Sequence, residues 1–199
     1  MNISTARRAL IALVTLGITP LLAAAPAAAE SLSYTDTTQD FWQFNTASTT
    51  ESYTAAPDQT DGDISRVTGR YARQLVIREK YVDLARETGT TLLAGYVRTN
   101  EGLRRGFEVK IRPTNWAGSM EFTNGRDQKV ACTGTSHHVD YTANTLLVTI
   151  PASCLSKPRW VQLQVGSVLV RHHQSDIYLD DAQSPGHGFR KWSQRIHRG

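Results

Sequence analysis

Hydrophobic residues alternate with polar ones over several short runs of the chain. Phe107, Val109 and Ile111 are separated by charged residues, and similar alternation recurs at 146–150 and 161–165. A two-residue period places one side of an extended strand in a core and leaves the other side in water. These runs therefore predict β-strands with one buried face.

One segment, 71–87, fits two patterns. Ile77, Tyr81 and Leu84 fit a helical stripe, whereas 75–81 is rich in β-branched and aromatic residues. We favour a strand over 75–81, because such residues pack well on a pleated surface, and a second strand over 92–98. The runs and the turn signals between them predict one jelly-roll-like, all-β sandwich of roughly eight to ten antiparallel strands.

The first residues have the pattern of an export signal. Arg7 and Arg8 precede the apolar run 9–22, and a small-residue stretch then ends at Ala29. We expect a signal peptide over 1–29, because the run is too short to span a bilayer. The predicted division is then a signal peptide, an N-terminal segment of uncertain order at 30–56 and a β-sandwich domain at 57–199. The expected location is extracellular or cell-wall associated, with no membrane span in the mature chain.

The charge balance changes once the signal is removed. The 199 residues hold 22 Lys and Arg against 18 Asp and Glu, and loss of Arg7 and Arg8 leaves 20 against 18, a net charge of +2. Nucleic acid is therefore not an expected partner. Basic residues do gather at 189–198, which predicts either a solvated edge strand or a site for an anionic partner.

The chain holds two cysteines, Cys132 and Cys154. An exported protein meets an oxidising environment in which such a pair normally closes. We therefore predict a disulfide bond between them. A zinc site or a catalytic thiol is the weaker interpretation, because the chain has no C-x-x-C motif.

The stretch DQTDGDI at 58–64 raises the question of a metal site. It does not fit an EF-hand loop, which would need a glutamate where Thr68 stands. Calcium accepts six to eight oxygen ligands on looser scaffolds, and two further aspartates precede the last strand. The candidate calcium ligands are Asp58, Asp61, Asp63, Asp180 and Asp181. The alternative, which we favour, is a turn whose aspartates bond to the local backbone.

Four stretches together resemble a known group: GDI at 62–64, RQLVIREKYVDL, TANTLLVTIPASCLSKPRWVQLQVG and YLDDAQSPG. The group comprises secreted β-sandwich proteins of high-GC Gram-positive bacteria, which are distantly similar to jelly-roll carbohydrate-binding and DOMON-like modules. The resemblance covers 57–199 and is most specific in IPASCLSKPRWVQLQVG, whereas 30–56 does not match. It implies a fold and an extracellular compartment, and no activity.

Aromatic residues supply candidates for ligand binding. Trp116 lies in the polar segment 113–118, where we expect an exposed loop, and Trp192 lies in the basic segment near the C-terminus. Such rings present flat, amphipathic faces. Trp116 and Trp192 are therefore the candidates for contact with a polysaccharide or another cell-wall component, and packing in the core is the favoured alternative for either ring taken singly.

Catalytic motifs are absent from the sequence. It contains no G-x-S-x-G, no H-E-x-x-H and no supported S-x-x-K motif. Glu108 and Glu121 are candidate glycosidase acids only if the fold brings their carboxyl groups about 5 to 10 Å apart. The prediction is a secreted, non-catalytic binding module for carbohydrate. A protein-interaction or inhibitor-like domain is the alternative, and a hydrolase is less favoured.

Overall fold

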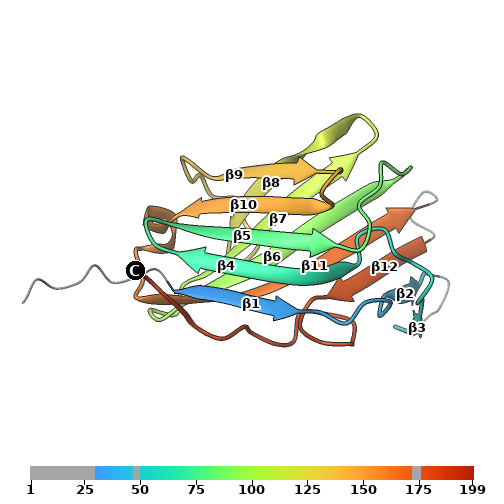
Figure 1. Ribbon diagram of the computed structural model, residues 1–199, viewed down its shortest axis with the longest axis horizontal. Coiled ribbons are helices and arrows are strands. Elements are labelled where there is room, and N and C mark those ends of the chain that lie inside the picture. Colours follow the sequence, from blue (N-terminus) through green and yellow to red (C-terminus); the bar gives the residue numbers. More distant parts are fainter. Residues whose placement is uncertain (1–29, 47–49, 172–175) are drawn as a thin grey trace, which may run out of the picture.

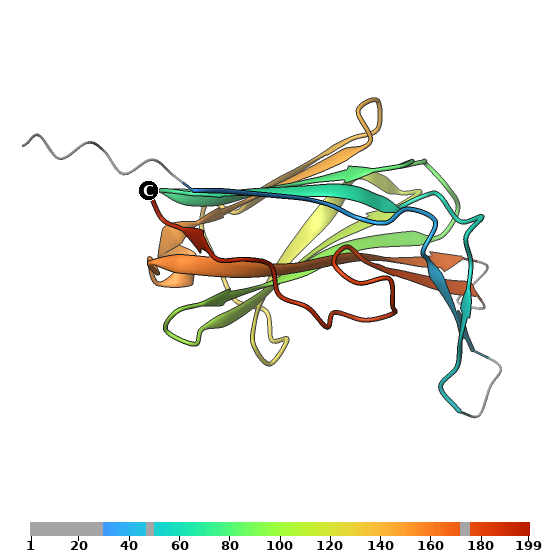
Figure 2. The same cartoon turned by 60° about the horizontal axis from the view of Figure 1, so that its bottom comes forward.

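The computed structural model describes residues 30–46, 50–171 and 176–199; the predicted signal peptide lies outside them. The described residues form thirteen strands and one 3₁₀ helix, arranged as two stacked antiparallel sheets (Figures 1 and 2). The predicted all-β sandwich is confirmed. The strand count exceeds eight to ten because short strands form near both ends. None of the described residues forms a helix long and apolar enough to cross a membrane.

Each sheet combines strands that are distant in sequence. Sheet A has the order β1 (Ser31–Thr35), β4 (Ile64–Tyr71), β5 (Gln74–Tyr81), β10 (Thr145–Pro151) and β9 (Ser136–Asp140). Sheet B has the order β3 (Tyr53–Ala55), β2 (Trp42–Asn45), β12 (Asp176–Asp181), β11 (Trp160–Arg171), β6 (Thr90–Thr99), β7 (Arg104–Arg112) and β8 (Asn115–Asn124). A further strand, β13 (Ile196–His197), pairs with β11, and the 3₁₀ helix spans Ala152–Leu155.

The strand over 75–81 is confirmed as part of β5 and shows why the alternation predicts it. Leu75, Ile77 and Tyr81 are fully buried, whereas Arg78 and Lys80 are exposed. Burying a leucine or isoleucine side chain contributes about 1.5–3 kcal/mol, so the alternation fixes which face of β5 meets the core.

The chain after β12 covers the remaining edge of β11. β12 pairs with β11 from Gly166 to Arg171, and the Ala182 amide then donates to the Val165 carbonyl (3.1 Å). The Ser193 amide donates to the Leu163 carbonyl (2.8 Å), and β13 completes the edge. Residues 183–192 swing outward between these contacts; Figure 2 shows this C-terminal segment in red. The edge is thus closed against pairing with another chain.

The disulfide bond between Cys132 and Cys154 is present. It joins the connection before β9 to the 3₁₀ helix after β10, and both cysteines pack against the core. The bond closes a loop of 22 residues.

Replacing Cys132 and Cys154 together by serine should lower the free energy of unfolding by about 3 kcal/mol, because the unfolded chain regains the entropy of this loop. Urea unfolding of the oxidised wild type, the reduced wild type and the double variant measures the effect. The two proteins without the bond should unfold at the same, lower urea concentration. Equal midpoints for all three would contradict the prediction.

Candidate functional site

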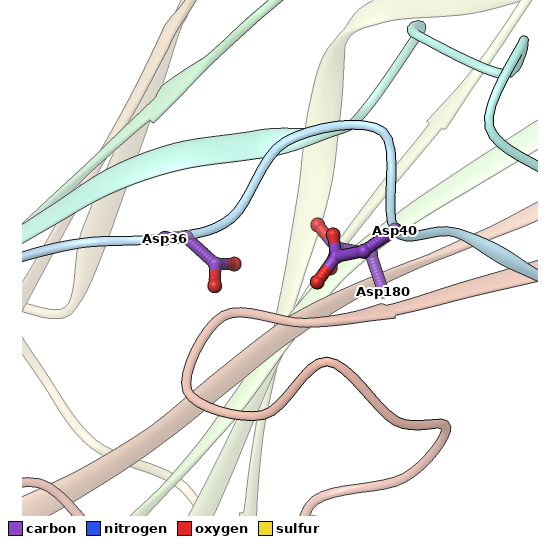
Figure 3. A group of neighbouring side chains, drawn as sticks. All are labelled: Asp36, Asp40 and Asp180. Carbon is purple, nitrogen blue, oxygen red and sulfur yellow. The ribbon is translucent and has the colours of Figure 1, made fainter.

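Three aspartates meet where the chain passes from sheet A to sheet B. Asp36 and Asp40 lie in the connection between β1 and β2, and Asp180 lies on β12. One carboxylate oxygen from each lies within 4.8 Å of the others, and in the described part of the chain no other such group of His, Cys, Asp or Glu occurs. Figure 3 shows Asp36 reaching toward the paired carboxylates of Asp40 and Asp180.

Hydrogen bonds hold this connection against the start of β4. The Asp36 amide donates to the Ser65 carbonyl (3.1 Å). Gln39 has a φ of 65°, a left-handed conformation that non-glycine residues adopt only when the surroundings require it. Its amide donates to Asp63 Oδ2 (2.8 Å). Asp63 thereby fixes the turn that carries Asp36 and Asp40.

Asp63 and Asp180 are buried, with exposed fractions of 0% and 3%. Asp180 Oδ2 accepts a hydrogen bond from the Ile64 amide (2.8 Å), so β12 is tied to β4 across the sandwich. Each of the two carboxylates still has one buried oxygen, Oδ1, without a hydrogen-bond partner.

The unpartnered oxygens of this region form the unusual feature of the site. They are Asp36 Oδ2, both oxygens of Asp40, Asp63 Oδ1 and Asp180 Oδ1, five atoms in all. A buried acceptor without a partner costs about 1–3 kcal/mol, and more when it is charged. None of the ion pairs formed by the described residues involves any of these four aspartates. Among the residues that the structure describes, none therefore forms an ion pair with the cluster.

Burial and the neighbouring carboxylates raise the pKa values of the three clustered aspartates. Burial, reinforced by Asp40, raises the pKa of Asp36 to about 8, and burial together with the charge of Asp63 raises the pKa of Asp40 to about 6. Burial also raises the pKa of Asp180 well above its usual range. Protons held by these groups relieve the repulsion in the absence of a cation.

The donor set matches a hard divalent cation. All its side-chain donors are carboxylate oxygens, and neither sulfur nor imidazole belongs to the cluster. Calcium favours such ligands and tolerates irregular arrangements of six to eight oxygens, whereas zinc favours nitrogen and sulfur. Asp36, Asp40 and Asp180 would be the direct ligands. Asp63 Oδ1 is also buried and has no hydrogen-bond partner.

Two of the five predicted metal ligands, Asp58 and Asp61, do not belong to this cluster. Asp58 is exposed. Asp61 accepts hydrogen bonds from the Ala85 amide (2.8 Å) and from the Arg171 guanidinium, so both of its oxygens are engaged. Gly62, at φ 80°, lies in a turn, as we favoured. The expected bonds from the aspartates to the local backbone are wrong, because the carboxylates of Asp61 and Asp63 accept hydrogen bonds from residues at least 24 positions away.

A third predicted ligand, Asp181, faces away from Asp180, because adjacent residues of a strand point to opposite faces. Its oxygens accept from the amides of Gln183 (3.2 Å) and Arg190 (3.3 Å). Asp181 thus holds the C-terminal segment rather than joining the cluster.

Sequence reasoning missed Asp36 and Asp40. Both lie in the segment 30–56, whose order the sequence left uncertain. The available signal was the spacing DTTQD at 36–40, two acids on either side of a polar turn and directly before the hydrophobic pair Phe41 and Trp42.

The two predicted tryptophans lie in different surroundings, Trp116 on a strand and Trp192 outside the strands. Trp116 lies on β8 and packs, partly buried, against the core, so the expected exposed loop is wrong. Trp192 lies in the C-terminal segment with the Arg98 guanidinium 4.5 Å from its ring centre and Arg104 at 6.0 Å. The strand register explains the first difference: Trp116, like Phe122, points inward from β8.

A groove of about 310 Å³ lies instead on the outer face of sheet B. Ala94 and Gly106 line its floor, Tyr96 and Phe189 stand beside it, and Glu108 and Glu121 face each other across β7 and β8. Phe189 reaches the sheet because Gly166 leaves space: a Cβ there would lie 2.8 Å from the ring. The volume lies at the small end of the range for ligand pockets.

One further buried acid lies between the sheets. Glu79 on β5 is completely buried and accepts a hydrogen bond from the Tyr81 hydroxyl, while its Oε1 has no partner. Burial raises its pKa to about 8, so this side chain is neutral at pH 7.

No family model, curated protein or solved structure matches the chain. The resemblance to secreted β-sandwich proteins stays a prediction.

Replacing Glu79 by glutamine should flatten the dependence of stability on pH. Folded Glu79 keeps its proton up to about pH 8, whereas an unfolded glutamate releases it near 4.5. The protonated Glu79 therefore does not lower the free energy of unfolding below pH 4.5. As the pH rises toward 8, this one residue lowers the free energy of unfolding by up to about 1.4 kcal/mol per pH unit. Glutamine does not titrate, so E79Q should lose less between pH 5 and pH 8.

Urea unfolding at several pH values, with calcium present throughout, measures this difference. Glu87, an exposed residue, provides the control variant Glu87→Gln, which should follow the wild type. Parallel curves for E79Q and the wild type would show that Glu79 is ionised in the folded protein.

Proposed function

We propose that the protein is an exported, non-catalytic binding domain whose fold is completed by a calcium ion at Asp36, Asp40 and Asp180, with Asp63 beside them. The observation that supports it is the set of five buried carboxylate oxygens without a partner. A calcium ion would satisfy oxygens that otherwise repel one another, and it would do so where the two sheets must be joined.

A calcium ion at this site would connect two parts of the fold, because its ligands come from different elements. Asp36 and Asp40 belong to the connection that leaves sheet A, and Asp180 belongs to sheet B. Bound calcium therefore links the two sheets at this end, and it fastens the N-terminal segment to a strand 140 positions later (180 − 40 = 140). Such a site stabilises a scaffold rather than supplying a reactive water.

Carbohydrate is the ligand class that we propose for the groove on sheet B. Tyr96 and Phe189 supply aromatic surface, while Glu108 and Glu121 supply acceptors for sugar hydroxyl groups. The combination of apolar surface with a few placed polar groups is typical of small-molecule sites. Its support is the composition of the groove alone.

The two alternative functions have weaker support. A protein-interaction domain would favour a large apolar patch, yet in the described ranges only Val82 is a large hydrophobic residue with an exposed surface. A glycosidase would require one carboxylic acid kept protonated by its surroundings. Glu108 and Glu121 are adjacent on paired strands, but their side chains are 40% and 48% exposed and each lies beside a lysine. Both therefore have the same solvated environment.

Asp36→Asn and Asp40→Asn should act in opposite directions on the calcium-free and the calcium-bound protein. Each removes a repelling charge, so thermal stability in a chelator should rise or stay equal. Each also removes a ligand, so stabilisation by calcium should be largely lost. For the wild type, calcium at a hundred times its dissociation constant should add about 2.7 kcal/mol.

Titration calorimetry with calcium chloride and thermal unfolding with and without chelator measure both effects on the mature chain, residues 30–199. Asp58→Asn, an exposed aspartate outside the cluster, is the matched control and should behave as the wild type. Absence of binding heat together with identical unfolding in calcium and chelator would refute the metal site.

Phe189→Ala should weaken retention of the mature chain on an insoluble polysaccharide by roughly tenfold, because an aromatic anchor in a groove commonly carries a large share of the binding energy. Cellulose, chitin and purified cell wall are the test materials. Val82→Ala is the control, since Val82 is an exposed apolar residue that lies outside this groove. Lack of retention of the wild type on every material, or equal losses for both variants, would exclude the groove as a glycan site.

A further inference from the structure

Positive charge gathers at the end of the sandwich opposite to the aspartate cluster. This basic end comprises the segments 69–75, 98–105, 151–160 and 195–199, which contain nine of the 20 basic residues of the mature chain and a single acid, Glu101. The nine are Arg70, Arg73, Arg98, Arg104, Arg105, Lys157, Arg159, Arg195 and Arg198. The net charge of only +2 for the mature chain therefore conceals a strong local imbalance.

Backbone contacts show that these distant segments lie together. The Ala152 amide donates to the Arg73 carbonyl (3.1 Å), and the Arg198 amide donates to the Arg159 carbonyl (2.8 Å). The Arg159 amide donates to Asn100 Oδ1 (2.7 Å), which brings in the β6–β7 turn. Four separate parts of the chain thus contribute cations to one end of the fold.

The cations of the basic end are not neutralised by acids of the protein. The described residues form three ion pairs, and none of the three includes a member of the basic end. Glu30, which lies nearby, accepts a hydrogen bond from the His197 amide instead (2.6 Å). Glu101 accepts one from the Asn100 side chain. Arg98, Arg105 and Arg198 donate hydrogen bonds to uncharged groups of the protein. The positive charges of the basic end are therefore not neutralised and can attract an external anion.

The basic end also has a concave surface. A pocket of about 470 Å³ is lined by Arg73, Lys157 and Arg198, with small residues between them. Arg73 and Lys157 are exposed, and neither side chain has a described hydrogen bond, ion pair or ring contact. Eight of the nine cations are arginines, whose planar groups suit paired hydrogen bonds to phosphate and carboxylate.

We propose that the basic end binds a linear anionic polymer that carries phosphate or carboxylate groups along its length. Cations distributed over four segments match a chain of repeated charges better than a single small anion. A membrane surface fits less well, because no large hydrophobic side chain of the described residues other than Val82 is exposed, and Val82 directly follows β5 at the end away from Gln74. Among its described residues, the basic end therefore lacks a fully exposed large hydrophobic side chain that could insert into a bilayer.

This binding goes beyond the calcium-dependent function proposed above and does not require it. β4 runs from Ile64, which contacts Asp180, to Tyr71 beside Arg198, and its eight residues span about 23 Å. That distance exceeds the Debye length of about 8 Å at physiological salt. The charge state of the aspartate cluster should therefore have little influence on the basic end.

The test measures binding of inorganic polyphosphate and of polygalacturonate to the mature chain at low and physiological salt. A triple variant should bind roughly a hundredfold more weakly, because each cation near a polyanion contributes to the free energy of binding. Its substitutions are Arg73→Glu, Lys157→Glu and Arg159→Glu. Raising the salt concentration should weaken wild-type binding in the same direction. Comparison of the two polymers distinguishes a phosphate from a carboxylate partner.

The matched control reverses three cations outside the basic end, Arg78, Arg86 and Arg112, and so has the same net charge as the test variant. It should bind as the wild type does. Calcium titration of every variant reports whether the fold and the aspartate site survive the substitutions, so failure of one proposal is separated from failure of the other. Absence of binding to both polymers or equal loss in the control would overturn the proposal, as would binding confined to phosphatidylglycerol vesicles, which are tested beside the two polymers.

Discussion

Two buried aspartates, Asp63 and Asp180, and two partly buried ones, Asp36 and Asp40, lie near one another, so that ionising all four is unfavourable unless a cation lies among them. This constraint governs the end of the sandwich at which sheet A passes into sheet B. Asp63 and Asp180 each use one oxygen to hold a backbone amide, of Gln39 and Ile64, and leave the other oxygen unpartnered. The same side chains therefore build the local structure and create its electrostatic conflict. Hydrophobic replacements could relieve the repulsion, but they would lose both backbone contacts.

The location of the cluster matters as much as its charge. The short strands β1 and β2 have few residues with which to bury apolar surface, so the N-terminal segment depends on contacts made by the connection between them. Phe41 supplies one such contact and is completely buried. The Asp36 amide supplies another through its hydrogen bond to the Ser65 carbonyl, and Asp63 holds the Gln39 amide. A cation at this point would contribute to the stability of the segment that has the least hydrophobic support of its own.

The alternation of buried and exposed residues made the long strands predictable, because their one-sided burial is a local property of the sequence. β5 and β6 follow this pattern residue by residue. Trp116 was misplaced because the inward-facing positions of β8 include Gly118, which interrupts the apolar pattern. Of the three clustered aspartates, sequence reasoning found Asp180 and missed Asp36 and Asp40. Asp63 and Asp180 stand beside recognisable strands, whereas recognising Asp36 required knowing that β1 and β12 end near each other in different sheets, a long-range fact that spacing does not contain.

Adjacent residues on β12 couple the aspartate cluster to the groove on sheet B. Asp180 points between the sheets toward Asp40, while Asp181 points to the outer face and accepts the Arg190 amide (3.3 Å). Phe189, which precedes Arg190, is thereby held over Gly166 beside Tyr96. A cation that fixes Asp180 also fixes the backbone of Asp181, and with it the segment that carries the aromatic wall. Calcium would therefore act on the groove through strand geometry, without contacting the ligand itself.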